Sequence, residues 1–310
     1  MNQPTSVPKK LIDDRNEPLF DDHFLETLEY LQIIARKILS GQMKAERRSR
    51  QKGVSVEFAD HRAYSPGDDF RFIDWSLFFR TEKLFLKLFE EEEDLHIYIL
   101  LDCSGSADFG VPYKFHYLRR LAAAVAYLGL ASLDRVFVVP FTTALPRSAA
   151  GMLQCRGKGK IFRVLEFLEG LKAGGPTALT SCMKSFANSK RKRGLAVVIS
   201  DFYDDQGAIS ALNALRYQKF EPFAIQVISP QESNPELYGD LRLLDCETGR
   251  YREVTLTEKL LRKYREAFEE YCSNLERFCR SRAIGYIRCN TAEPFQETVI
   301  RMLRRERFLQ

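Results

Sequence analysis

The sequence predicts an α/β fold: a doubly wound, mainly parallel sheet of Rossmann-like type, preceded by an N-terminal helix and a small strand-rich module. From Leu95 onward, short apolar runs bounded by turn residues alternate with amphipathic helical segments, a pattern typical of βαβ crossovers. The chain has 310 residues, 45% of them apolar and 29% charged, which is ordinary for a globular protein with a full core. These observations favour one large sheet domain over a disordered or fibrous chain.

The first 40 residues are expected to form a flexible lead and one helix. Residues 1–18 carry three prolines and little periodicity. Asp22 is a good N-cap for the helical spacing that follows, and Gly41 is expected to end that helix.

Residues 41–94 are predicted to form a strand-rich module. A basic stretch at 42–52 leads into alternating residues, and the turn sequence Ser-Pro-Gly-Asp at 65–68 separates them from two further segments. Both segments, 70–79 and 84–94, are rich in aromatic and apolar residues and are interpreted as strands. Trp75, the single tryptophan, is expected in the core.

Residues 95–310 are predicted to form the sheet domain. A hairpin is expected as an insertion at about 231–257, followed by a long helix with one apolar stripe. The expected strands are 97–101, 136–141, 195–200, 223–228 and 284–289, and the expected helices are 114–131, 160–171, 179–190, 207–217 and one from about 295.

Composition narrows the function classes. The net charge of +5 comes from 47 basic and 42 acidic residues and indicates no particular partner. Seven cysteines without a Cys-x-x-Cys spacing favour reduced thiols, and Cys272 and Cys279, seven residues apart, are expected in the core. The N-terminus lacks a signal-peptide core, and the longest uncharged stretch has 13 residues. We therefore expect a soluble, cytoplasmic chain.

Oxygen-bearing side chains follow three of the predicted strands and loops. Asp102, Ser104 and Ser106 come directly after the strand 97–101, Thr177 lies on a Gly-Gly-Pro-Thr loop before a helix, and Asp201 ends the strand 195–200. Because parallel strands end at one edge of a sheet, these loops are expected to converge. Hard oxygen ligands without His or Cys suit Mg²⁺, or a similar divalent cation such as Mn²⁺.

The combination of hydroxyl and carboxylate ligands favours a site that binds a partner's carboxylate over a catalytic site. Hydroxyls are neutral and short, so they can bind the ion directly while Asp102 and Asp201 act through water. The cation then keeps an attraction for an incoming carboxylate, which can fill its open position. A switch-like adhesion site is expected rather than a hydrolase.

These residues, in this chain order, resemble the metal-ion-dependent adhesion site of von Willebrand factor type A domains. The preceding segment resembles the bacterial family called domain of unknown function 58, with small departures at Ala107 and at Phe78-Phe79-Arg80. The resemblance implies a bound divalent ion and work beside MoxR-type AAA ATPases in assembling or activating other complexes. Many relatives carry two N-terminal membrane helices, which are not seen here. The family-like residues are Glu57-Phe58, Arg62-x-Tyr64, Pro66-Gly67-Asp68-Asp69, Arg71, Ile73-Asp74-Trp75 and Phe89-Glu90-Glu91-Glu92.

A second charged group surrounds the Pro-Gly turn of the module. Arg62, Asp68, Asp69, Arg71 and Asp74 are interpreted as a structural ion-pair network, with a partner-docking surface as the alternative. The planar guanidinium binds carboxylates in pairs, so the two arginines are the expected anchors in either case.

Two other functions are left open beside a non-enzymatic interaction module. One is a phosphatase-like hydrolase with Asp102 as nucleophile, although Ser104 stands where such chemistry needs a second carboxylate, and no Gly-x-Ser-x-Gly motif or nearby histidine suggests a serine hydrolase. The other is a weak nucleic-acid binder through the basic clusters at 47–52 and 190–193, which lack interleaved aromatic residues. The acidic run at 90–94 is expected to be a solvated edge.

Overall fold

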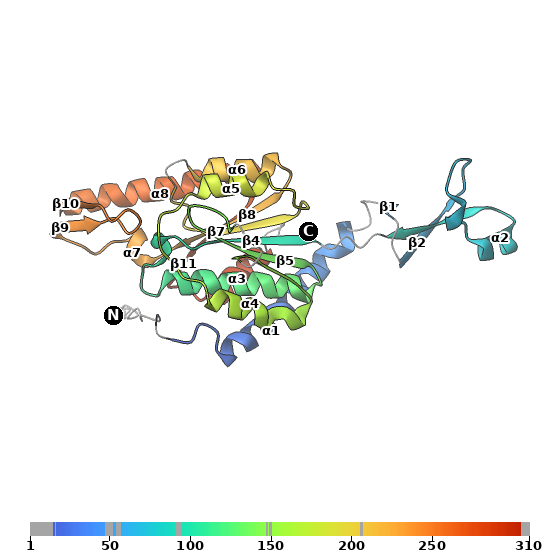
Figure 1. Ribbon diagram of the computed structural model, residues 1–310, viewed down its shortest axis with the longest axis horizontal. Coiled ribbons are helices and arrows are strands. Elements are labelled where there is room, and N and C mark those ends of the chain that lie inside the picture. The colour runs from blue at the N-terminus through green and yellow to red at the C-terminus, as the bar shows by residue number, and fades with distance from the viewer. Residues whose placement is uncertain are drawn as a thin grey trace, which may run out of the picture. The chain divides into compact units, whose positions relative to one another are not determined.

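The computed structural model describes residues 15, 17–46, 52–53, 57–90, 95–146, 148, 151–204 and 207–304. The chain divides into two compact units (Figure 1): one comprises residues 39–94, and the other comprises residues 1–38 together with 95–310. The second of these is called the sheet unit below. From the sequence, residues 1–40 were expected to form a separate segment. In the structure, the first part of the N-terminal helix groups with the sheet unit.

The sheet unit is built on six strands in the order β11-β8-β7-β4-β5-β6. All neighbours pair in parallel except β6, which runs antiparallel to β5 at the edge. This confirms the predicted α/β class with a mainly parallel sheet. The strands are β4 (His96–Asp102), β5 (Arg135–Phe141), β6 (Leu153–Arg156), β7 (Leu195–Ser200), β8 (Glu221–Ile228) and β11 (Gly285–Asn290).

The order of the strands creates a switch point at the centre of the sheet. From β4 the chain moves outward to β5 and β6, and from β7, the other neighbour of β4, it moves the opposite way to β8 and β11. In open α/β sheets, ligands bind beyond the carboxyl ends of the strands at such a point. Here the two strands that meet there end in Asp102 and Ser200.

Helices cover both faces of the sheet. Figure 1 shows α5 (Leu179–Ala187), α6 (Ala208–Tyr217) and α8 (Glu258–Ser281) on one face, with α3 (Lys114–Ala131) and α4 (Ile161–Glu169) on the other. The helix α9 (Phe295–Arg304) packs against α3 and β11. None of the helices that the structure describes is both long enough and apolar enough to cross a membrane.

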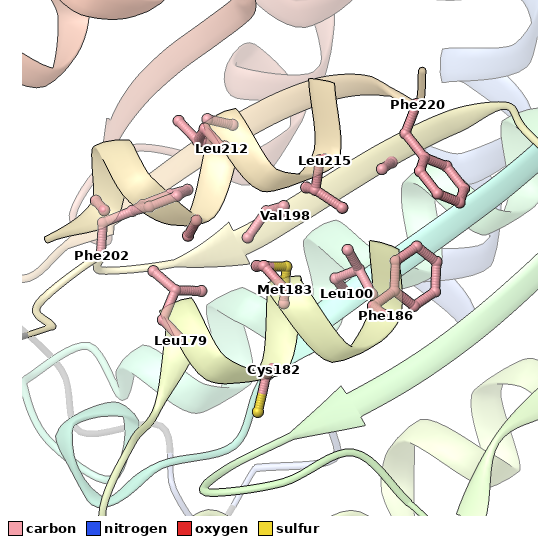
Figure 2. Packing of buried hydrophobic residues seen from close by; sticks show 14 of the residues in the cluster. Leu100, Leu179, Cys182, Met183, Phe186, Val198, Phe202, Leu212, Leu215 and Phe220 are labelled. Carbon is pink, nitrogen blue, oxygen red and sulfur yellow. The ribbon is translucent and has the colours of Figure 1, made fainter. Parts of the chain in front are cut away.

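The core under α5 and α6 forms because each helix carries an apolar stripe that faces the buried strands. Figure 2 shows Met183 and Phe186 of α5 and Leu212 and Leu215 of α6 gathered around the strand residue Val198. All five side chains are fully buried, and burial of a large apolar side chain contributes about 1.5–3 kcal/mol. The predicted core residues Cys272 and Cys279 of α8 are buried as expected.

The N-terminal helix α1 (Asp22–Glu46) begins one residue earlier than expected, because Asp21 rather than Asp22 caps it by accepting a hydrogen bond from Phe24 N at 2.8 Å, and the helix continues past Gly41. Glycine lowers helix stability without forbidding it, and the following Gln-Met-Lys-Ala-Glu are all good helix formers. Leu28 and Leu31 of α1 are fully buried, and the ring of Phe24 lies 5.2 Å from that of Phe295. These contacts explain why the first part of α1 belongs to the sheet unit.

The unit of residues 39–94 contains a three-stranded antiparallel sheet in the order β1-β3-β2. Its strands are β1 (Lys52–Gly53), β2 (Glu57–Ala63) and β3 (Phe85–Glu90). The strand expected at 70–79 is wrong, because a 3-10 turn (Phe70–Phe72) and α2 (Trp75–Thr81) together occupy most of it. The Asp74 carboxylate caps α2 by accepting a hydrogen bond from Leu77 N at 3.1 Å, which favours the helix over a strand. Trp75 was expected in the core, but 53% of it is exposed.

A hairpin interrupts the alternation of strands and helices, as predicted. After the short helix α7 (Pro230–Ser233), β9 (Gly239–Leu244) pairs antiparallel with β10 (Tyr251–Leu256). The turn between them is held by Asp245, whose Oδ1 accepts hydrogen bonds from the backbone N–H groups of Glu247 at 2.8 Å and Thr248 at 2.9 Å. Figure 1 shows the hairpin beside α7, at one end of α8.

Candidate functional site

Asp102 lies at the switch point with both carboxylate oxygens engaged. Its Oδ2 accepts a hydrogen bond from Ser200 Oγ at 2.6 Å, and its Oδ1 accepts one from Ser104 N at 3.0 Å. Only 2% of the residue is exposed. Burial, reinforced by the nearby charge of Asp201, raises the pKa of Asp102 from its usual 3.8 to about 6. The environment therefore disfavours an uncompensated negative charge on this carboxyl.

The two serines of the Asp-x-Ser-x-Ser motif point their hydroxyls at one another. Ser104 Oγ lies 3.0 Å from Ser106 Oγ, and Ser104 is fully buried while Ser106 is half-buried. A short 3-10 turn at Gly105–Ala107 brings them to the same side of the loop. Two adjacent ligands of an octahedral ion, each at 2.1 Å, are separated by about 3.0 Å. The serine spacing matches that geometry.

The Thr177 loop lies directly against the serine loop. Gly174 N donates to Cys103 O at 2.9 Å, and Gly105 N donates to Gly175 O at 2.7 Å. Gly175 has a φ of +80°, a conformation that side chains rarely adopt, so the second glycine is needed for the turn. The Oγ1 of Thr177 is buried and has no hydrogen-bond partner among the described residues. A buried hydroxyl without a partner is costly, which suggests a ligand that completes it.

Asp201 is joined to a lysine that the sequence interpretation did not include. The fully buried Lys114 donates from Nζ to Asp201 Oδ2 at 2.9 Å and to Glu232 Oε1 at 2.7 Å. Burial alone would lower the pKa of Lys114, but the two carboxylates outweigh it and raise that pKa. A sequence signal existed: Lys114 begins a helix whose other side chains are mostly apolar, a place where a lysine needs a partner.

Glu247 of the hairpin turn is a second residue that was missed. Its Oε2 accepts a hydrogen bond from Thr177 N at 2.9 Å, and the nearby Ser106 hydroxyl lowers the pKa of its carboxyl. Burial raises the pKa of Glu247, and the charge of Asp201 adds to this rise. No pattern in the sequence identifies Glu247, because it lies 70 residues from Thr177 within an ordinary turn.

The five predicted site residues therefore lie in one polar region at the carboxyl edge of the sheet. Among the described residues, no three His, Cys, Asp or Glu side chains are grouped as metal ligands. A cation at this edge would have to rest on hydroxyls, with the carboxylates supporting it. The 3.0 Å spacing of the serine hydroxyls and the unsatisfied Thr177 Oγ1 fit such a group.

The charged group of the smaller unit forms separate pairs rather than one network. Arg62 bonds Asp68 at 2.7 Å, and Arg71 bonds Asp69 at 2.6 Å. Asp74 pairs with neither arginine. It lies 2.9 Å from His61 Nε2 and 3.6 Å from Lys87 Nζ. These pairs are local to the unit. The two arginine pairs are largely solvent-exposed, so each contributes little to its stability.

Two arginines of the basic cluster at 190–193 make contacts within the chain. The guanidinium of Arg191 lies 5.4 Å from the centre of the Phe186 ring, and that of Arg193 lies 4.8 Å from the centre of the Phe220 ring. Arg193 also donates to Ala187 O at 3.3 Å. Most of the other basic cluster, residues 47–51, lies outside the described residues, as do residues 91–94 of the acidic run.

Fold and site together define a doubly wound α/β domain with a polar, acidic site at the switch point of its sheet. A family model described as "Protein of unknown function DUF58" matches residues 60–274, and the chain belongs to this family.

The chain is also similar to other proteins. An uncharacterized protein of Mycobacterium tuberculosis is 23% identical over 285 residues, covering 91% of this chain and 90% of its own. Two solved structures are similar at lower sequence identity. The conserved hypothetical protein BatB of Bacteroides thetaiotaomicron covers 67% of this chain and 97% of its own, with 15% identity and a TM-score of 0.39. A von Willebrand factor type A protein of Catenulispora acidiphila covers 70% and 43%, with 14% identity and a TM-score of 0.38.

Proposed function

We propose that this protein is a non-enzymatic interaction module whose switch-point site holds a divalent cation, Mg²⁺ or Mn²⁺, and receives an acidic side chain from a partner protein. The observation that carries the proposal is the group of three hydroxyls. Ser104 and Ser106 have the spacing of adjacent octahedral ligands, and the buried Thr177 hydroxyl beside them lacks a partner among the described residues. Asp102 and Asp201 supply the negative charge that attracts the ion.

The surroundings of Asp102 support recognition rather than hydrolysis. A nucleophilic carboxylate needs a free oxygen that faces the substrate, whereas both oxygens of Asp102 accept hydrogen bonds and the residue is 2% exposed. The nearest base in the site, Lys114, is bound by two carboxylates. When bound, the cation would supply a positive charge that attracts a carboxylate from outside.

The partner class in this proposal comes from the family resemblance. MoxR-type AAA ATPases are the partners that it implies, with assembly or activation of other complexes as the shared task. An interaction that depends on one metal-bound carboxylate can be switched by the metal or by a change in the partner, which suits such a task.

Metal binding is tested first on the purified full chain. We expect Mg²⁺ to raise the melting temperature, because a ligand at a hundredfold excess over its Kd contributes about 2.7 kcal/mol of stability. Ser104→Ala should abolish this gain. The matched control is Ser181→Ala, which removes an exposed hydroxyl from the helix that follows the Thr177 loop. Equal Mg²⁺ responses in the wild type and in Ser104→Ala would exclude the hydroxyl site.

Partner capture is tested next, with the chain as bait in Mg²⁺ or in EDTA and with an AAA ATPase as the scored product. We expect capture in Mg²⁺, loss in EDTA and loss with Ser104→Ala. Capture of the ATPase that is independent of the metal and of Ser104 would refute the proposed mechanism.

A further inference from the structure

The hairpin places a carboxylate of the chain itself at the mouth of the proposed cation site. Glu247 accepts from Thr177 N at 2.9 Å, and the Ser106 hydroxyl lies close enough to its carboxylate to lower the pKa of Glu247, so Glu247 lies beside both loops that carry the three hydroxyls. It is half-buried, whereas its neighbours in the turn are exposed. The turn therefore directs this one side chain inward.

The backbone of the hairpin turn also packs closely against the serine loop. A Cβ added to Gly105, which lies between the two serines, would come within 2.8 Å of Cys246 O and 3.2 Å of Gly175 O. The glycine thus lets the hairpin turn and the Thr177 loop close over the serine loop. Asp245 stiffens the turn by accepting the N–H groups of Glu247 and Thr248.

The hairpin is otherwise weakly tied to the sheet unit. Its strands pair with each other over six residues each, and neither packs extensively against any other named element. Several of its apolar side chains face solvent, including Leu244 at 70% and Tyr251 at 58% exposed. An element with few buried contacts opens at low free-energy cost. The contacts of its turn are therefore well suited to being broken and remade.

We infer that Glu247 is an internal carboxylate ligand, which takes the position on the cation that a partner's acidic side chain would otherwise fill. The inference rests on the proposed function and deepens it: the site is closed by its own hairpin and becomes available when the turn lifts. A partner that presents an Asp or Glu side chain therefore competes with Glu247 rather than filling an open position.

The test uses Mn²⁺ as the probe of the full chain, with free Mn²⁺ measured by electron paramagnetic resonance and its bound water by proton relaxation. Loss of a group that supports a metal costs about 10- to 100-fold in affinity. We expect Glu247→Gln to weaken Mn²⁺ binding by about tenfold and to raise the relaxivity of the bound ion, because water replaces the carboxylate. Glu253→Gln, an exposed glutamate on the same hairpin, is the matched control and should change neither value.

A free carboxylate tests the competition directly. Added N-acetylglutamate should lower the relaxivity of Mn²⁺ bound to Glu247→Gln and should leave the wild type unchanged.

Cys246 offers an independent readout, because it is exposed while the other six cysteines are buried. Mn²⁺ should slow its modification by a maleimide several-fold in the wild type, since the ion holds the turn down, and should leave the rate unchanged in Glu247→Gln.

The outcomes separate the two proposals. Mn²⁺ binding that requires Ser104 but is identical in the wild type and Glu247→Gln, in affinity and relaxivity, overturns the role of Glu247 and leaves the cation site intact. Absence of Mn²⁺ binding by the wild type overturns the cation site, and the role of Glu247 with it.

Discussion

Replacing Asp102 by asparagine should stabilise the metal-free protein while weakening its response to Mg²⁺. The carboxyl is buried, and its pKa is raised from 3.8 to about 6. Each pKa unit corresponds to 1.36 kcal/mol, so the ionised form costs the folded state about 3 kcal/mol. Asparagine removes the charge but breaks the hydrogen bond that Ser200 donates, which costs about 1 kcal/mol. The net gain is about 2 kcal/mol, or roughly 4 °C in melting temperature.

The gain should depend on pH in a defined direction. Between pH 4 and about 6, the folded protein retains the Asp102 proton while the unfolded chain releases it, so this group destabilises the fold as pH rises through that window. The difference between Asp102→Asn and the wild type should therefore be large at pH 8 and small at pH 4. Thermal melts in EDTA at both values measure it.

Mg²⁺ should reverse which of the two proteins has the higher melting temperature. With Mg²⁺ at saturation the wild type gains stability and Asp102→Asn gains less, because the carboxylate that compensates the ion is gone. Asp108→Asn, at the exposed end of the same loop, is the control and should follow the wild type. If Asp102→Asn melts below the wild type in EDTA at pH 8, the reasoning about the buried charge is wrong.

Two further substitutions test the packing that supports the site. Lys114→Met leaves the buried Asp201 without the ammonium group that pairs with it, and it should destabilise the metal-free protein by about 3–5 kcal/mol in urea unfolding. The control Lys158→Met removes one partner of a half-exposed ion pair and should change the free energy of unfolding by less than about 1 kcal/mol. Gly129→Ala puts a Cβ within 2.6 Å of a β4 side chain and should cost about 1–3 kcal/mol, while Gly159→Ala, which has open space, should cost almost nothing. Equal effects within either pair would contradict the contacts described.

The topology and the edge that carries the site could be predicted because both depend on local patterns. The apolar runs that became β4 and β7 are followed by Asp102 and Asp201, and a parallel sheet brings the ends of such strands to one side. Strand β6 was missed because its four residues are too few, and too evenly divided between buried and exposed, to form an apolar run.

The smaller unit shows where a local pattern misleads. The sequence Trp-Ser-Leu-Phe-Phe is rich in residues that favour strands, yet α2 forms there because Asp74 caps its first turn. Strand propensity is counted over the five side chains and does not include the stabilisation of a helix by a single capping residue. The exposure of Trp75 follows from the same error, since its burial was expected from a strand that does not form.

The residues that sequence reasoning missed are those whose role depends on distance in space. Lys114 reaches Glu232 across 118 positions of the chain, and Glu247 reaches Thr177 across 70. Each would be read locally as a helix start or a turn residue. Only the fold shows that both point into the region of Asp102.

Charge explains why this region should take a cation and why its internal ligand can be exchanged. Four carboxylates, Asp102, Asp201, Glu232 and Glu247, share the site with one ammonium, Lys114, which leaves a formal excess of three negative charges. A divalent ion reduces that excess to one. Replacing Glu247 by a partner's carboxylate leaves the charge unchanged, so the exchange costs little electrostatic free energy. Its equilibrium is then set by how firmly the hairpin holds Glu247 in place and by the contacts that the partner adds, which is how a weakly packed hairpin would control access to a buried site.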